Sequence, residues 1–448
     1  MLAKQKVLTI LERVLAASKT EAAEVVLIES DSALTRFADN VIHQNVANHD
    51  VRLTVRLAQG NRIGVAGTNA IDPDAIRDVV TRATEIAAVV AETPDFPGLP
   101  NPVETQQIAC FDDAVADCSP GARADLVKIA VDCAKANAAQ AAGALATTAS
   151  SIAVANSLGV RAFHAGTEAS LNLTMTVGKT ANKPGSSART TQVGWKLSDL
   201  DVNSAAERVA ERALAGRDPI DLEPGAYAVV LAPSAVATLV EMLSHLGFGA
   251  KAYQERRSFM TGKMGLKITG SDITIVDDGL DEAGIPFPFD FEGMPKRRVV
   301  LLEKGVAKGV VHDSRTAAVE GKTSTGHALP AKQAAYGPYA WNLFMSAGDS
   351  FLEEMIASTR HGLLVNDFHY VNIAEPMKTV LTGMTRFGTF LIEDGKLGSP
   401  VRDLRFTQSV LDAFERVAAL SRDLTRFDGC VVPALKIDSF HFTGKTGC

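Results

Sequence analysis

The chain has 448 residues, of which 46% are hydrophobic and 22% are charged. This composition is ordinary for a soluble globular protein, and the length is sufficient for two or three domains around a large buried core. The net charge of −7 excludes an overall basic protein of the kind that nucleic acids or anionic membranes attract, so we expect neither as a partner.

Five cysteines are too few, and odd in number, for a disulfide framework. The N-terminal segment has charges spread through its apolar positions, which is typical of an amphipathic helix rather than a secretory signal. No apolar segment approaches the roughly 20 residues that a membrane span needs. We therefore expect a cytoplasmic protein.

The first half combines helices with antiparallel strands. The N-terminal helix runs to about Ser18, and partial period-two alternation after it predicts an antiparallel meander. Asp72 as the N-cap and Pro73 at the first helical position predict the start of a second helix. The predicted elements are strands over 24–30, 35–46, 50–60 and 61–69, helices over 72–91 and 121–141, a strand pair over 146–177, a polar loop over 178–191 and a helix over 203–216.

A boundary near residues 218–225 divides the chain into predicted domains 1–217 and 218–448. Beyond it, strands and loops dominate, with hairpin turns predicted at residues 304–305 and 394–395. The fold class that we predict is α+β, with an N-terminal domain of antiparallel sheet and helices and a larger β-rich C-terminal domain. The predicted elements here include a strand over 226–233 and helices over 233–249, 350–359 and 409–421.

Several common catalytic motifs are absent from the sequence. There is no G-x-S-x-G, no Rossmann glycine pattern after a strand and no paired Cys-x-x-Cys. The two Gly-Lys-Thr fragments lack the upstream glycine that a phosphate loop needs, because Thr316 and Ser439 stand there. His43 and His49 are six residues apart on extended chain, roughly 20 Å, which is too far to share a metal. We interpret the scattered histidines as structural.

One helix carries part of a metal-binding pattern. Residues four apart share a helix face, which is why the two histidines of H-E-x-x-H can bind one zinc ion. With a spacing of five, the second residue points about 140° away from the first, so the helix must bend before both can bind one metal. In the stretch VEMLSH, Val240 stands at the first ligand position, followed by Glu241 and His245. The same helix has the spacing of a core stripe, which would leave Glu241 facing solvent; the stripe consists of Ala237, Val240, Leu243 and Leu246.

Segments in both halves resemble the TldD/PmbA (TldD/TldE) family of zinc peptidases, which uses the longer motif H-E-x-x-x-H. The resemblance covers nearly the whole chain, and the order of the motifs makes it specific. A pattern D-x-E-G-x-x-x-x-R begins at Asp290 and precedes a hairpin, as in the family's C-terminal domain. The resembling segments are 36–57, 60–69, 93–100, 150–167, 282–317, 324–328, 385–401 and 433–444.

The family has two branches, and the resemblance is to the TldE (PmbA) type. TldD-type subunits carry the zinc motif and a cysteine ligand near the C-terminus, whereas TldE-type subunits lack the motif and pair with TldD to enclose one chamber. The resemblance therefore implies no catalytic residue and no metal in this chain, zinc in a TldD-type partner, and peptide substrates. Cys430 lies near the region of the family's cysteine ligand, but it stands three residues before Pro433, closer than the ligand loop would require.

We thus expect a non-catalytic TldE/PmbA-like subunit that forms a heterodimer with a TldD-type zinc peptidase and helps to hold an extended peptide. Two alternatives remain at this point: a stand-alone hydrolase with another site, and a homodimeric binding or regulatory protein without peptidase activity. Val240, Glu241 and His245 are the degenerate metal-motif positions, and Cys430 is the candidate remnant of the third ligand. Candidate chamber or interface segments are 178–187, 324–330 and 334–342.

Overall fold

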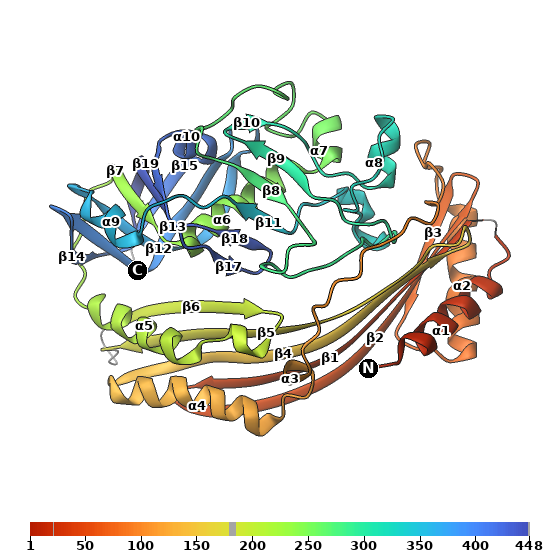
Figure 1. Ribbon diagram of the computed structural model, residues 1–448, viewed down its shortest axis with the longest axis horizontal. Helices are drawn as coiled ribbons and strands as arrows, with labels where there is room; N and C mark the ends of the chain where they lie inside the picture. The colour runs from red at the N-terminus through yellow and green to blue at the C-terminus, as the bar shows by residue number, and fades with distance from the viewer. Residues whose placement is uncertain (21, 179–184, 447–448) are drawn as a thin grey trace.

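The computed structural model describes residues 1–20, 22–178 and 185–446, so residues 179–184 of the predicted polar loop lie outside the described residues. A six-stranded sheet of long strands occupies the first part of the chain (Figure 1). Its order is β3-β2-β1-β4-β5-β6, and every neighbouring pair is antiparallel. The strands are β1 (Ala22–Ala38), β2 (Val41–Gln59), β3 (Arg62–Thr68), β4 (Ala139–Asn156), β5 (Arg161–Val177) and β6 (Ser186–Gly194).

The predicted strand pair at 146–177 is confirmed, but the helix predicted over 121–141 ends earlier. The backbone turns at Ala138, which has a positive φ of 49°, and residues from Ala139 onward pair with β5. Alanine favours helices intrinsically, so the pairing with a neighbouring strand overrides the local preference here.

Helices α1 to α5 cover one face of this sheet (Figure 1). The odd-numbered residues of β4 and β5, among them Leu145, Leu171 and Leu173, point into these helices because side chains alternate along a strand. The start of α2 is as predicted, with Asp72 accepting hydrogen bonds from the first-turn amides. The helices are α1 (Lys4–Ala17), α2 (Pro73–Val89), α3 (Asp113–Ala116), α4 (Pro120–Ala136) and α5 (Val202–Ala215).

The C-terminal part contains two further sheets. One is six-stranded, with the order β10-β9-β8-β11-β18-β17. The other has the order β12-β7-β19-β15-β13-β14. In this second sheet β13 also pairs with β12, which closes the path of strands into a ring. The strands are β7 (Gly225–Leu231), β8 (Ile275–Asp277), β9 (Val299–Glu303), β10 (Val306–Ala307), β11 (Leu343–Met345), β12 (His361–Glu375), β13 (Val380–Glu393), β14 (Lys396–Val401), β15 (Leu404–Ser409), β16 (Val417–Leu420), β17 (Thr425–Phe427), β18 (Cys430–Val432) and β19 (Leu435–Lys445).

Helix α6 (Pro233–Leu243) packs against both C-terminal sheets, through β12 and β18, and its apolar residues belong to one core with them. The helix predicted over 409–421 is wrong in its second half, where residues from Val417 pair with β19 as strand β16. No helix among the described residues is long and apolar enough to cross a membrane. The remaining α-helices are α7 (Ala250–Gln254), α8 (Ser314–Val319), α9 (Leu352–Ala357) and α10 (Val410–Glu415). The mixed α+β class that we predicted is confirmed.

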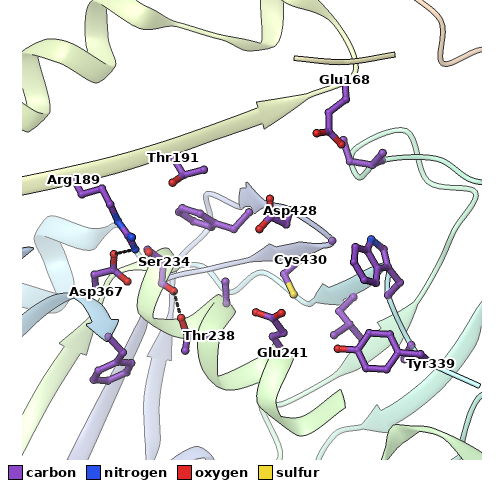
Figure 2. Close-up of a pocket in the computed structure, with 18 residues that line it drawn as sticks. Glu168, Arg189, Thr191, Ser234, Thr238, Glu241, Tyr339, Asp367, Asp428 and Cys430 are labelled. Atoms are coloured by element: carbon purple, nitrogen blue, oxygen red, sulfur yellow. Dashed lines mark hydrogen bonds and ion pairs between the residues drawn. The ribbon is translucent and has the colours of Figure 1, made fainter. Parts of the chain in front are cut away.

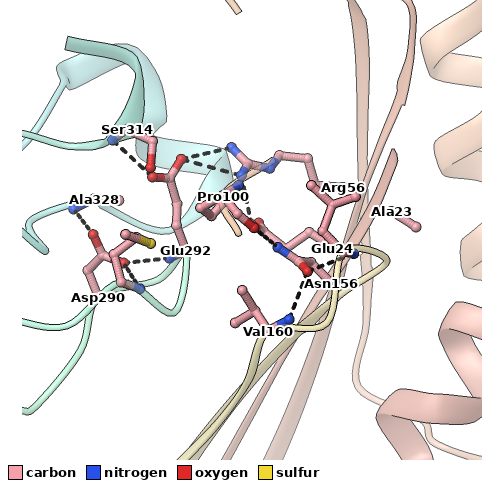
Figure 3. A network of polar contacts seen from close by, with 12 residues as sticks. Ala23, Glu24, Arg56, Pro100, Asn156, Val160, Asp290, Glu292, Ser314 and Ala328 are labelled. Carbon is pink, nitrogen blue, oxygen red and sulfur yellow. Dashed lines mark hydrogen bonds and ion pairs between the residues drawn. The ribbon is translucent and has the colours of Figure 1, made fainter. Parts of the chain in front are cut away.

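A buried ion cluster joins the first sheet to the C-terminal part (Figure 3). Arg56 on β2 lies 2.7 Å from a Glu24 oxygen and 3.3 Å from Glu292 Oε1, and the other Glu292 oxygen accepts a hydrogen bond from the Ser314 amide. Beside it, Phe289 packs against apolar side chains of β1 and β4. Burial raises the pKa of Glu24 to about 7, although the Arg56 charge opposes this shift. The cluster therefore holds the sheet against the C-terminal part and couples this contact to pH.

Candidate functional site

Helix α6 has two faces with different surroundings. Val236, Val240 and Leu243 are completely buried in the C-terminal core. The opposite face consists of Ser234, Ala237, Thr238 and Glu241, which share it through spacings of three and four residues, and these residues line a cavity. The predicted core stripe is therefore confirmed at Val240, Leu243 and Leu246, whereas Ala237, although buried, lines the cavity.

Val240 has an exposed fraction of 0% and does not line the cavity. Glu241 has a side chain that is 58% exposed, but it points into the cavity rather than into open solvent, as Figure 2 shows. Adjacent residues on a helix point about 100° apart, and here Val240 points into the core while Glu241 points into the cavity. The structure separates the first position of the motif from the second.

The helix is distorted from Ser244 onward, three residues after Glu241. A turn of π-helix over Ser244–Phe248 follows α6, and π-turns inside helices re-aim the side chains that follow them. His245, which is 47% exposed, lies with Nε2 3.1 Å from the Tyr339 hydroxyl and 4.0 Å from Glu241 Oε1. Gly247 is required here, because a Cβ at this position would lie 2.4 Å from the Ser258 hydroxyl. The bend that a spacing of five residues needs is thus present, and it directs His245 to Tyr339.

The cavity itself has a volume of about 480 Å³ and lies between the first sheet and the C-terminal part (Figure 2). Strands β5 and β6 contribute Glu168, Arg189 and Thr191, while the turn before β18 contributes Asp428. A volume of this size is typical of sites for small ligands or short peptide segments. The C-terminal part contributes α6, Tyr339 to Trp341, Asp367 and Cys430, together with Ile285, Leu343, Phe368, Phe427 and Gly429.

The charges that line the cavity are mostly negative. Arg189 is paired with Asp367 at 2.5 Å, which leaves Glu168, Glu241 and Asp428 without a basic partner among the described lining residues. Burial raises the pKa of Glu168, and the nearby Asp428 charge adds to the shift. The arrangement favours a ligand group that is positively charged or that donates hydrogen bonds.

Cys430 lines the same cavity and is buried. Burial raises the pKa of its thiol far above the ordinary value, and the charges of Glu241 and Asp428 raise it further. The thiol is therefore protonated at neutral pH and behaves as a small apolar group. Folding does bring Cys430 to the cavity that Glu241 lines, although the two residues are far apart in the sequence.

These residues do not fit a catalytic zinc ion. Such a site needs about three protein ligands around an open position, whereas the Val240 side chain has no lone pair and points into the core. Within residues 1–20, 22–178 and 185–446, a group of three metal-capable side chains whose ligand atoms lie within 4.8 Å occurs only at Glu29, Asp31 and His49. That group lies on β1 and β2, away from α6.

Several lining residues escaped the sequence reasoning. Arg189 and Thr191 are two positions apart on β6 and so share a face, a signal that was hidden because the segment reads as a polar loop. Of the candidate segments, Tyr339 and Trp341 do line the cavity, and Trp341 and Tyr336 are strongly exposed. His327, in the segment 324–330, is buried.

Comparison with known proteins gives a consistent set of matches. Family models described as PmbA/TldA metallopeptidase domains match residues 23–87 (domain 1), 119–217 (central domain) and 224–444 (C-terminal domain). The chain is 25% identical over 272 residues to the "Metalloprotease TldD homolog" of Haemophilus influenzae, covering 56% of this chain and 55% of that protein. It is 22% identical over 249 residues to the "Zinc metalloprotease TldD homolog" of Saccharolobus solfataricus, covering 53% and 54%.

The matches thus span about half the length of these curated relatives. Among solved structures, TldE from Thermococcus kodakarensis superposes with a TM-score of 0.88 at 21% identity, covering 99% of this chain and 100% of that one. At this level of identity, the likeness shows a shared fold.

Proposed function

Since the chain belongs to the PmbA/TldA metallopeptidase family, we propose that it is a non-catalytic subunit of the TldE type, which pairs with a TldD-type zinc peptidase to form a chamber for short or unstructured peptides. The observation that carries this proposal is Val240, a buried core residue at the position where the motif needs its first zinc ligand. Likeness in fold to TldE over the whole chain supports it.

The contribution of this chain to the chamber would be to hold the peptide. Strand β6 is the edge of the first sheet, and its Arg189 and Thr191 side chains line the cavity beside Glu241. An extended peptide can add to a sheet edge through main-chain hydrogen bonds, while neighbouring pockets select its side chains. Glu168, Glu241 and Asp428, which have no lysine or arginine partner among the described lining residues, would favour peptides with a basic group near this edge. We also place the pair in the cytoplasm.

The test is co-expression with a TldD-type partner, followed by zinc analysis of each chain and assay of peptide cleavage. We expect cleavage only in the mixture, full inhibition by a chelator, and loss of activity when the partner's motif glutamate is changed to Gln. Glu241→Gln in this chain should leave kcat within a few-fold of the unmodified complex, since Glu241 would bind peptide rather than activate water.

Two results would refute the proposal. Chelator-resistant cleavage by this chain alone that Glu241→Gln abolishes would make it a hydrolase with its own site. A stable homodimer that never exchanges with a TldD-type chain would favour a binding or regulatory protein instead.

A further inference from the structure

A second cavity, of about 440 Å³, adjoins the first and shares Tyr339 and Trp341 with it. Its walls are largely apolar and include Ile152 from β4, Trp195, Phe287, Phe291 and Leu329. Concave, mostly apolar sites with a few polar groups are the usual form of small-molecule sites. None of the motif residues on α6 belongs to this cavity, so its chemistry is separate from that of the zinc-motif remnant.

The polar group that distinguishes this cavity is Lys296. It is the one lysine or arginine among the described residues that line the cavity, and its exposed fraction is only 8%. Its aliphatic stem passes Gly279, where an added Cβ would lie 3.1 Å from the stem's Cγ and Cδ atoms. The ammonium group forms no hydrogen bond or ion pair within 4.0 Å with any residue that the structure describes. A buried lysine without such a partner is rare, because the charged form then loses its hydration without compensation.

The two acidic groups whose charges act on this lysine, Asp277 and Asp290, already accept hydrogen bonds from other donors. Asp277 receives hydrogen bonds from His327 Nε2 at 2.7 Å and from the Asn342 amide at 3.0 Å. Asp290 accepts hydrogen bonds from the backbone amides of Glu292, Met294 and Ala328. Glu292 and Ala328 are labelled in Figure 3. Both acids act on Lys296 only through space, and burial still lowers the pKa of the lysine, although these two charges oppose the shift.

The opposite wall adds little charge. Cys110 Sγ lies 3.2 Å from His164 Nε2, and burial raises the pKa of this thiol to about 11 and lowers that of the imidazole to about 4. Both groups are therefore neutral near pH 7, and the pair is a thiol beside an imidazole rather than an ion pair. Glu168 lies at the rim shared with the first cavity, and burial raises its pKa.

We propose that this cavity binds a carboxylate attached to an apolar body, with the Lys296 ammonium group as the partner of the carboxylate. An ammonium with three free N–H donors at the wall of an apolar cavity matches an anionic acceptor on an apolar ligand, because charge-assisted hydrogen bonds are strongest where water is excluded. The carboxylate can be the free carboxyl terminus of a peptide with an apolar last residue or a small free acid. The proposal does not depend on the pairing described above, since the cavity and its lysine belong to this chain alone.

The test measures binding of 3-phenylpropanoate and of its neutral amide to the isolated full-length chain by calorimetry at pH 7. We expect the acid to bind roughly ten- to a hundredfold more tightly than the amide, the range that a hydrogen bond to a charged group supports. Lys296→Met keeps the unbranched stem of the side chain and removes the ammonium group, and it should abolish this preference. Lys267→Met, at an exposed lysine outside the cavity, should leave the preference unchanged.

A second pair of variants avoids the buried charges in case Lys296→Met does not fold. Ser150 on β4 lines the cavity, so Ser150→Phe should fill it and prevent binding of the acid, whereas Ser150→Ala should not. N-acetyl-alanyl-phenylalanine distinguishes the two sources: tighter binding than phenylpropanoate assigns the site to peptide carboxyl termini, and weaker binding assigns it to free acids. Equal affinity for acid and amide in the unmodified chain, or binding of the acid that survives Ser150→Phe, would overturn the proposal.

Discussion

Val240→His is the substitution that completes the motif string, and we expect it to destabilise the protein without creating a peptidase. The side chain of Val240 is completely buried among C-terminal core residues. Losing its burial costs about 1.5–3 kcal/mol, and placing an imidazole there without a hydrogen-bond partner costs about 1–3 kcal/mol more. The expected loss in the free energy of unfolding is therefore about 2.5–6 kcal/mol, a large part of the 5–15 kcal/mol that a typical domain has.

The assay is urea denaturation with zinc and with a chelator, alongside peptide cleavage in the presence of an inactivated TldD-type partner. Thr238→His is the matched control, since Thr238 lies on the same helix but lines the cavity, and we expect a loss below about 1 kcal/mol there. The reasoning fails if Val240→His is as stable as the unmodified chain, or if zinc restores its stability and chelator-sensitive cleavage appears. Either result would mean that position 240 faces the cavity.

Three further substitutions and one metal analysis test other parts of the structure. Arg56→Met leaves Glu24 and Glu292 buried without their counter-charge and should lower the free energy of unfolding by about 3–5 kcal/mol. Arg52→Met, at an exposed position, should cost little. Equal effects of the two substitutions in urea denaturation would contradict the buried pairing. The pKa of Glu24 is about 7 in the folded chain and about 4.5 in the unfolded chain, so protonation of Glu24 stabilises the fold below pH 4.5, and this contribution is lost as the pH rises to 7. Glu24→Gln should therefore gain stability relative to the unmodified chain between pH 5 and 8. A difference in stability that does not change with pH would be inconsistent with the shift. Cys430→Ser should lower the free energy of unfolding by about 1–3 kcal/mol, because it buries a hydroxyl where no hydrogen bond is formed now. Cys430→Ala should lower it by less and keep the activity of the complex. Loss of activity in a folded Cys430→Ala complex would show that the thiol has a functional role. The isolated chain, purified without added zinc, should contain well below one equivalent by elemental analysis, and one tightly held zinc per chain would contradict the geometry of α6.

Local features of the fold were predictable from the sequence. The turns at Lys304-Gly305 and Asp394-Gly395 adopt positive φ at both residues, and they close hairpins as predicted. The start of α2 follows from Asp72 and Pro73 alone, because capping depends on neighbouring residues. Features of this kind need no knowledge of the rest of the chain.

Pairings between distant residues were not predictable. The ring of strands depends on the parallel pairing of β7 with β12, which joins Val229 to Leu363 across more than a hundred residues. The same is true of the site, where Glu241 and Cys430 line one cavity only because α6 packs beside β18. For residues 139–141, alanine-rich sequence fits a helix as well as a strand, and β5 decides between them.

The D-x-E-G motif, which the sequence analysis used only for the resemblance to a family, has a physical role in the structure. Asp290 binds three backbone amides and so fixes a tight loop, from which Glu292 reaches Arg56 on the first sheet. Gly293 has a φ of 75°, and a Cβ there would lie 2.5 Å from a Val160 methyl group, so the sheet approaches the loop too closely for any other residue. Three residues later the same segment supplies Lys296. Asp290, Phe291 and Lys296 of this segment line the second cavity, so we expect a change that releases Glu292 from Arg56 to alter ligand binding there as well as stability.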